Sequence, residues 1–207
     1  DQELSTTQHI AKVTASCFYQ LRQLRQIRRP VGQELVAQLV HSFVLSGLDY
    51  GNSVLAGLPK SAIMPLQRVQ NAAARLILDL RMNDHVTPAL RQLHWLPVDR
   101  RVKFKLCTMM HAIHTGQCLT YSADMVRAVA VHQTRSGLRS ADTAQYQKPR
   151  CRTEIGKRAF SYAGPLAGNA LPPSLHNITD SKCFRKQLKT HYFTRAFVDL
   201  LYACLDN

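Results

Sequence analysis

Four residues in the middle of the chain carry side chains of the kind that bind transition metals. The set is Cys107, His111, His114 and Cys118, at relative positions i, i+4, i+7 and i+11. Thiolate and imidazole groups are zinc ligands, but a helix rises ~1.5 Å per residue, so the two cysteines would lie ~16 Å apart. Gly116 is also expected to end the helix before Cys118. We therefore predict ordinary core or rim side chains and no metal site, although Cys107 and His111 could still bind zinc together with outside ligands.

The sequence also lacks the closely spaced carboxylates that a polymerase uses for catalysis. A polymerase holds two metal ions on closely placed carboxylates, but the sequence contains no Asp-Asp pair and no Asp-x-Asp pair. It has no GxSxG elbow for a hydrolase and no GxxxxGK[ST] loop for a nucleotide phosphate. A hydrolase would need two polar side chains that converge from distant positions. We expect no catalytic residue and no cofactor in this chain.

Positive charge is the strongest chemical signal. The 207 residues include 27 Lys and Arg against 13 Asp and Glu, a formal charge of +14. Such an excess repels itself unless an anion compensates it, and nucleic acid is the commonest such partner, followed by an acidic membrane surface. No apolar run reaches the ~18 residues that a membrane-spanning helix needs. The composition therefore favours RNA or DNA as the partner, and we expect no membrane.

The cations that we expect to contact phosphates form three groups along the chain. One follows a predicted helix, one crowds the start of the next long helix, and one lies in a stretch with few acidic residues. Each phosphate that they neutralise would release counterions, so binding should weaken steeply with salt. Some of these candidate cations will instead pair with carboxylates of the chain itself. In order, the candidates are Arg68, Arg75 and Arg81; Arg100, Arg101, Lys103 and Lys105; and Arg135, Arg139, Arg150, Arg152, Lys157 and Arg158, with Lys148 among the last group.

Hydrophobic periodicity predicts a mainly α chain: a helical bundle, a basic loop or short hairpin, and a further small helical region. The clearest helix runs to about residue 80, with Leu66, Val69, Ala73, Leu76, Ile77 and Leu80 in one stripe. We predict further helices over 7–29, 33–46, 87–93, 100–115, 121–131, 158–164, 165–170 and 180–202, and a strand over 146–153. The helical bundle is expected over 1–80, a helical continuation with Trp95 and the start of the basic helix over 81–131, and the basic loop or hairpin with the C-terminal helices over 132–207.

Several single residues mark the expected boundaries and the core. Pro30 with Gly32 should end the first helix and Gly47 the second, whose buried side would include Leu35 and Phe43. Further boundary markers are Thr87 and Asp99 as N-terminal caps, Gly116 as a C-terminal stop, and Thr179 or Asp180 as the cap of the last helix. The only tryptophan, Trp95, could stack on a base beside His94. A tryptophan between leucines is more often a core residue, and that is our prediction.

The compartment follows from the cysteines and the first residues. Six cysteines are scattered without a CxxC pair, which indicates reduced thiols in a nuclear or cytoplasmic protein. The first ten residues have neither a basic nor an apolar segment typical of a signal peptide. Because there is no initiator methionine, we expect the sequence to begin inside a larger polypeptide.

Several blocks, in this order, carry a resemblance to a known family. They are VHSFVLSGLDYGNSVLAGLP (Val40–Pro59), LQRVQNAAARLI (66–77), DHVTPALRQLHWLPVDRRVKFKL (84–106), LRS (Leu138–Ser140), GKRAFSYAGPLAGNALP (Gly156–Pro172) and FRKQLKTHYF (Phe184–Phe193). Together they resemble the region after the polymerase core in reverse transcriptases of LINE-type (non-LTR) retrotransposons, of the jockey and chicken-repeat kind. The resemblance covers nearly the whole chain. It departs at Gly51, where a cysteine is common, and at Gly168, where a tryptophan is common.

The resemblance implies a thumb through about residue 80 and a basic C-terminal region that positions RNA, an RNA–DNA hybrid or target DNA. Polymerase chemistry, with its Mg²⁺, would belong to a palm domain absent from this sequence. The parent protein would then be an RNA-directed DNA polymerase. The alternative is a protein-interaction module, either a domesticated fragment or a piece that docks on its own palm. Its apolar helix faces would then be the functional surface.

Overall fold

The computed structural model describes residues 6–126 and 146–203, and within these ranges the chain is helical and contains no strand. The mainly α prediction is confirmed. The chain forms two compact units. Of the described residues, unit 1 contains 6–52, 58–101 and 193–203, and unit 2 contains 53–57, 102–126 and 146–192. Each unit is assembled from separate stretches of sequence, and the helices α6 (Val98–His114) and α11 (Ser181–Ala203) contribute residues to both.

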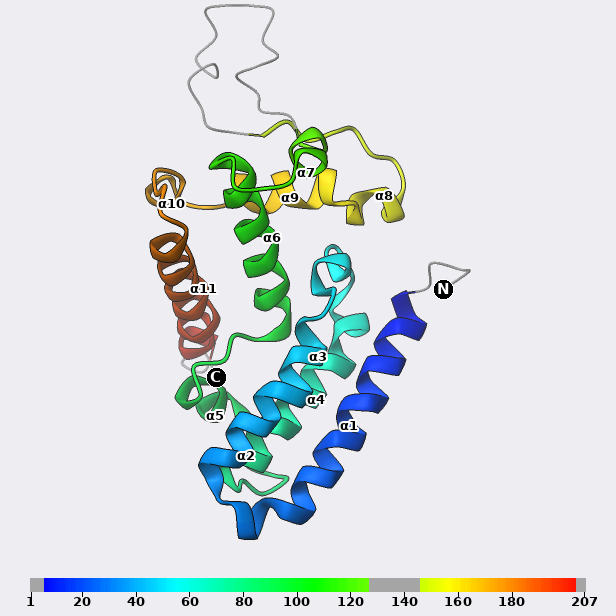
Figure 1. Cartoon of the computed structure of the whole chain (residues 1–207), viewed down its shortest axis with the longest axis vertical. Helices are drawn as coiled ribbons and strands as arrows, with labels where there is room; N and C mark the ends of the chain where they lie inside the picture. Colours follow the sequence, from blue (N-terminus) through cyan, green and yellow to red (C-terminus); the bar gives the residue numbers. More distant parts are fainter. Residues whose placement is uncertain (1–5, 127–145, 204–207) are drawn as a thin grey trace, which may run out of the picture. The chain divides into compact units, whose positions relative to one another are not determined.

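Unit 1 is built around the pair α1 (Thr6–Val31) and α4 (Lys60–Leu78), which lie side by side (Figure 1). The helix α2 (Gln33–Val40) packs on both and continues through a π-helical turn, His41–Leu45, into α3 (Ser46–Asp49). The predicted apolar stripe of α4 faces this core. Its fully buried members are Leu66, Val69, Ala73 and Ile77, and they meet the buried side chains of α1, which are Ile10, Cys17, Leu21 and Leu24.

Two predicted helix ends in unit 1 are displaced. The first helix continues through Pro30 to Val31, and the chain turns at Gly32, whose φ is +82°. Gly47 does not end the second helix but lies inside α3. A Cβ atom built on Gly47 would lie 3.5 Å from the Sγ of Cys17 in α1, so the glycine sits where the two helices pack closely. The prediction that Gly47 ends the second helix was wrong, because a glycine inside a helix can also allow a neighbouring helix to pack closely.

The expected burial of Leu35 and Phe43 is wrong. Their exposed fractions are 53% and 54%, whereas Val36, Val44 and Leu45 are at 1% or below. Leu35 and Phe43 are eight residues apart and share one edge of the helix, whereas Val36 and Val44, one position further along, lie on the buried side. The period predicts which residues share a side, but it does not predict how far neighbouring helices cover the edge of that side.

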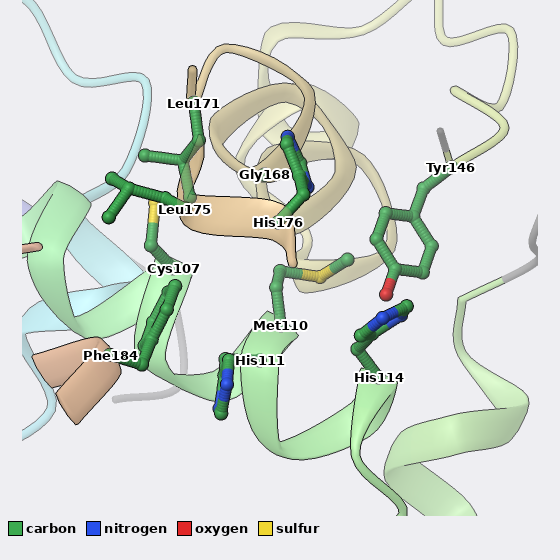
Figure 2. A pocket seen from close by; sticks show the side chains of 10 residues that line it. All are labelled: Cys107, Met110, His111, His114, Tyr146, Gly168, Leu171, Leu175, His176 and Phe184. Carbon is green, nitrogen blue, oxygen red and sulfur yellow. The ribbon is translucent and has the colours of Figure 1, made fainter. Parts of the chain in front are cut away.

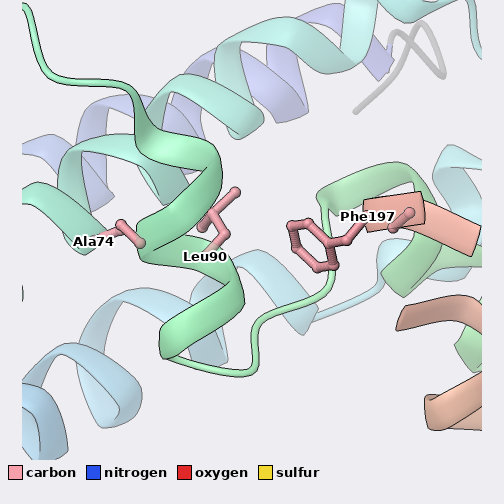
Figure 3. Close-up of a cluster of buried hydrophobic side chains, with 5 residues drawn as sticks. Ala74, Leu90 and Phe197 are labelled. Carbon is pink, nitrogen blue, oxygen red and sulfur yellow. The ribbon is translucent and has the colours of Figure 1, made fainter. Parts of the chain in front are cut away.

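The rest of unit 1 is a small cluster that draws on three helices (Figure 3). The helix α5 (Val86–Gln92) contributes Ala89 and Leu90, α4 contributes Ala74, and α11 contributes Ala196 and Phe197. Trp95 packs against this cluster, half-buried, as a core residue. The predicted Thr87 cap is wrong, because α5 begins at Val86 and has no side-chain cap.

Unit 2 takes the larger part of α6 and the first half of α11, with four short helices between them in the sequence. These are α7 (Thr120–Asp124), α8 (Glu154–Arg158), α9 (Phe160–Asn169) and α10 (Pro173–His176). The buried side chains include Leu106, Cys107, Met110, Ala163, Leu171, Leu175, Phe184, Leu188 and Tyr192. They form the core that holds α6 and α11 in this unit.

The predicted helix ends in unit 2 agree with the structure in part. Gly116, with φ +68°, follows the end of α6, and the backbone N–H of Cys183 donates to Asp180 Oδ2 over 2.7 Å, which caps α11. Asp99 is no cap, because α6 already begins at Val98. Pro165 lies within α9 and does not separate two helices.

The predicted strand at 146–153 is wrong, because those residues form no strand and helix resumes at Glu154. The predicted helix over 121–131 is described only as far as residue 126, and its helical part ends at Asp124. Among the helices of the described ranges, none is both long and apolar enough to span a membrane.

Candidate nucleic-acid interface

The first predicted group of cations belongs to unit 1 and is only partly available. Arg68 on α4 and Arg81 just after it are exposed and form no ion pair with a described carboxylate. The Nη2 atom of Arg75 instead donates to the backbone oxygen of Asp84 over 3.2 Å, and its side chain is half-buried. Arg75 therefore fixes the loop after α4, and two of the three predicted residues remain free to meet phosphate.

The second group, at the start of α6, separates into two kinds of residue. Arg101 makes a two-pronged pair with Asp49: its Nε donates to Oδ1 over 2.8 Å and its Nη2 donates to Oδ2. Arg100 lies 3.4 Å from the carboxylate of Asp99, measured from Nε to Oδ2. Lys103 and Lys105 are exposed and have no described carboxylate partner. The two lysines are the phosphate candidates here, and the two arginines are already neutralised.

The third group lies in unit 2 and contains exposed side chains before α8. Lys148, Arg150 and Arg152 are exposed and are not paired with any carboxylate of the described residues. Lys157 pairs with Glu154, and this hydrogen bond and charge raise the pKa of the lysine and lower the pKa of the carboxyl group. Arg158 is half-buried. Arg135 and Arg139 lie outside the described residues.

Two rows of cations were not among the candidates. On α11, Lys182, Arg185, Lys186 and Lys189 are all exposed, and none has a carboxylate partner in the described ranges. On α1, Arg22, Arg25 and Arg29 are exposed in the same way, while Arg28 pairs with Asp79. Both rows have helical spacing, i, i+3, i+4, i+7 and i, i+3, i+7, which puts their members on one side of a helix. This spacing is visible in the sequence and would have identified them.

Of the cysteine and histidine set, Cys107 and His111 belong to the unit 2 core, whereas His114 is exposed and Cys118 is half-buried. The Sγ of Cys107 lies 3.2 Å from the hydroxyl of Tyr192 and donates to the backbone oxygen of Ala167 over 3.5 Å. The ring of His111 stacks on Phe184 with centroids 3.9 Å apart (Figure 2). The Nε2 of His111 lies 2.7 Å from the backbone oxygen of Ile178. Both side chains are buried. No three metal-ligating side chains come together in the described parts of the chain.

A small cavity lies beside these residues, lined by side chains of α6, α10 and α11 and by Tyr146 and Gly168 (Figure 2). Its volume of about 20 Å³ is enough for a single water molecule and far too small for a nucleotide. A Cβ atom on Gly168 would lie 3.7 Å from three atoms of Met110, so this methionine packs where Gly168 has no side chain.

Burial raises the pKa of the Cys107 thiol from its ordinary 9.0 to about 11, with Tyr192 and Lys103 acting weakly in the opposite direction. The unfolded chain therefore loses this proton first as pH rises. The thiol should stabilise the fold fully below pH 9, and this contribution of about 2 to 3 kcal/mol should disappear between pH 9 and 11.

We expect Cys107→Ala to reduce the loss of stability across this window, as measured by urea denaturation at pH values on either side of it. Cys183→Ala removes an exposed thiol and serves as the control. If both variants lose stability with pH as steeply as the unmodified chain does, Cys107 is not the group that titrates.

No family model, no curated protein and no solved structure matches this chain.

Proposed function

We propose that this chain is a non-catalytic, nucleic-acid-binding C-terminal portion of a retrotransposon reverse transcriptase. The observation that carries the proposal is a set of exposed cations with no carboxylate partner among the described residues: Arg68, Arg81, Lys103, Lys105, Lys148, Arg150 and Arg152. A formal charge of +14 adds to it. The resemblance of the sequence blocks to LINE-type elements supports the choice of parent protein.

The proposed mechanism is recognition of phosphates and helix shape, with little reading of bases. The deep, narrow major groove of an A-form duplex cannot be read by side chains, and its wide, shallow minor groove displays mainly 2′-hydroxyls, so proteins contact the sugars and phosphates. Lysine and arginine side chains make such contacts, and Arg68, Lys103 and Lys105 present them from helices. Bond making would belong to a palm domain elsewhere in the parent polypeptide, and this chain would hold the template, the primer or the target.

The test is the salt dependence of binding between the 207-residue chain and a short RNA–DNA hybrid, measured by fluorescence anisotropy. Each lost phosphate contact lowers the slope of log K against log salt by ~0.9 in a duplex. The double variant Lys103→Gln/Lys105→Gln should therefore lower this slope by about 1 to 2. The matched control is Arg100→Gln/Arg101→Gln, which removes two charges from the same helix that Asp99 and Asp49 already neutralise. An equal loss in both variants would contradict the assignment to unpaired lysines.

A protein-docking function is the second candidate, and the exposure of Leu35 and Phe43 favours it. They lie eight residues apart with the half-buried Leu39 between them, on one side of α2 and its π-helical continuation. The same preparation discriminates between the two functions. Binding to the hybrid that weakens with salt supports the first, whereas self-association in sedimentation without hybrid binding supports the second and overturns the first.

A further inference from the structure

The first half of α11 carries a continuous basic row, which we call the α11 stripe: Lys182, Arg185, Lys186 and Lys189. All four side chains are exposed, and none is paired with a carboxylate of the described residues. The sequence contains no acidic residue between Asp180 and Asp199. Their spacing of i, i+3, i+4 and i+7 gathers them on one side of the helix.

Contacts in unit 2 fix which way this stripe faces. Phe184 and Leu188, on the other side of the same helical turns, are 2% and 0% exposed. The stack of His111 on Phe184 and the Asp180 cap hold the rotation and the start of the helix. The stripe is therefore presented outward on a rigid element and does not depend on a flexible tail.

The positive charges of the α11 stripe destabilise the helix that carries them. Lys182 with Lys186 and Arg185 with Lys189 are like-charged pairs four residues apart, which repel each other on a helix. Lys182 also lies in the first turn, where the helix dipole already places partial positive charge. The Asp180 cap offsets part of the dipole, but no described carboxylate pairs with any of the four cations. An arrangement that is unfavourable in the free chain becomes favourable when an anion with several charges binds along it.

The dimensions fit a phosphate backbone. Seven residues of helix rise ~10 Å, and one strand of a duplex carries a phosphate about every 3.4 Å along the axis. The stripe thus spans about three phosphates. An acidic membrane would be the other extended anion, but no residue among 181–197 is an exposed large hydrophobic, and the apolar side of these turns is buried in unit 2. Nothing on this surface could insert between lipids.

We propose that the α11 stripe is a docking surface for the sugar–phosphate backbone of a nucleic-acid duplex. This inference rests on the proposed function. It adds a contact surface that is separate from Lys103 and Lys105 of α6. The stripe would bind without base specificity, and Phe184 and Leu188 would act only by holding the helix.

The test compares two fourfold variants of the 207-residue chain. One is Lys182→Gln/Arg185→Gln/Lys186→Gln/Lys189→Gln. The control removes four exposed cations that are scattered over α1, α4, α5 and another side of α11: Lys12→Gln, Lys60→Gln, Arg91→Gln and Arg195→Gln. Glutamine keeps the helix propensity close to that of lysine and arginine, and circular dichroism checks that both variants stay folded.

For the stripe variant we expect the salt slope of hybrid binding to fall by about 3 and the Kd to rise at least ~10-fold, with a change in slope below about 1 for the control. An equal fall in salt slope and an equal rise in Kd for both variants would overturn the proposal for the α11 stripe. The more general proposal of nucleic-acid binding would then still stand. Absence of binding by the unmodified chain at low salt would overturn both proposals. Stripe-dependent binding to vesicles of phosphatidylserine and phosphatidylcholine, with none to the hybrid, would assign the surface to lipid and overturn the nucleic-acid docking.

Discussion

Replacing Phe184 by alanine should lower the free energy of unfolding of unit 2 by about 3 to 5 kcal/mol. The side chain is 2% exposed, and its ring stacks on His111 at an interplanar angle of 16°. Truncation removes the apolar area buried by the ring and leaves a cavity beside an imidazole that loses its stacking partner. Urea denaturation followed by far-UV circular dichroism measures the loss. Hydrogen exchange of the amides in 102–114 of α6 and 181–192 of α11, which belong to unit 2, assigns the loss to that unit.

The neighbouring residue supplies the matched control, because Arg185 is exposed and has no described ion-pair partner. Arg185→Ala should change the stability by less than about 0.5 kcal/mol. The two variants also separate structure from binding. Phe184→Ala should weaken hybrid binding only as far as the chain unfolds, whereas Arg185→Ala should weaken binding in a folded chain. A Phe184→Ala variant as stable as Arg185→Ala would mean that the ring is not in the core and that the stripe is not held outward.

Local patterns predicted those parts of the fold that depend on neighbouring residues. The α4 stripe is buried at Leu66, Val69, Ala73 and Ile77 because a regular helix brings these positions to one side. Asp180 and Gly116 mark helix ends because capping and positive φ are properties of a few adjacent residues. The mainly α character follows from the same signals.

Features that depend on distant residues could not be predicted in this way. Arg101 was expected to contact phosphate, but Asp49, which is 52 positions away in the sequence, neutralises it. Leu35 and Phe43 were expected to be buried, but the packing of unit 1 covers the neighbouring Val36 and Val44 instead. Neither an ion pair between residues far apart in the sequence nor the extent to which one helix covers another leaves a trace in the spacing of a single segment. The α11 stripe is different, since its spacing and its lack of acidic neighbours are local and were open to detection.

Gln70 is the clearest case of a core residue with a polar side chain. It was not expected in the core, yet it has no exposed surface, and its Nε2 donates to the backbone oxygen of Leu96 over 2.8 Å. Its Oε1 accepts a hydrogen bond of 3.0 Å from Gln67, whose own Oε1 accepts from the backbone N–H of Val98 over 2.9 Å. These two glutamines of α4 bind the segment between α5 and α6, which lies within unit 1. A buried amide is tolerated because both its donor and its acceptor are satisfied.

Gln70→Leu should therefore destabilise unit 1 by about 2 to 3 kcal/mol, although leucine is the more hydrophobic residue. The substitution leaves the backbone oxygen of Leu96 buried without its donor and removes one of the two acceptors of Gln67 Nε2, the other being Asn71 Oδ1. Urea denaturation measures the change, and fluorescence of Trp95, next to Leu96, reports on the same segment. The control is Gln92→Leu on α5, an exposed glutamine for which we expect less than about 0.5 kcal/mol. A Gln70→Leu chain more stable than the unmodified one would show that hydrophobic burial outweighs the hydrogen bonds, and that the segment is held by Trp95 and its apolar neighbours alone.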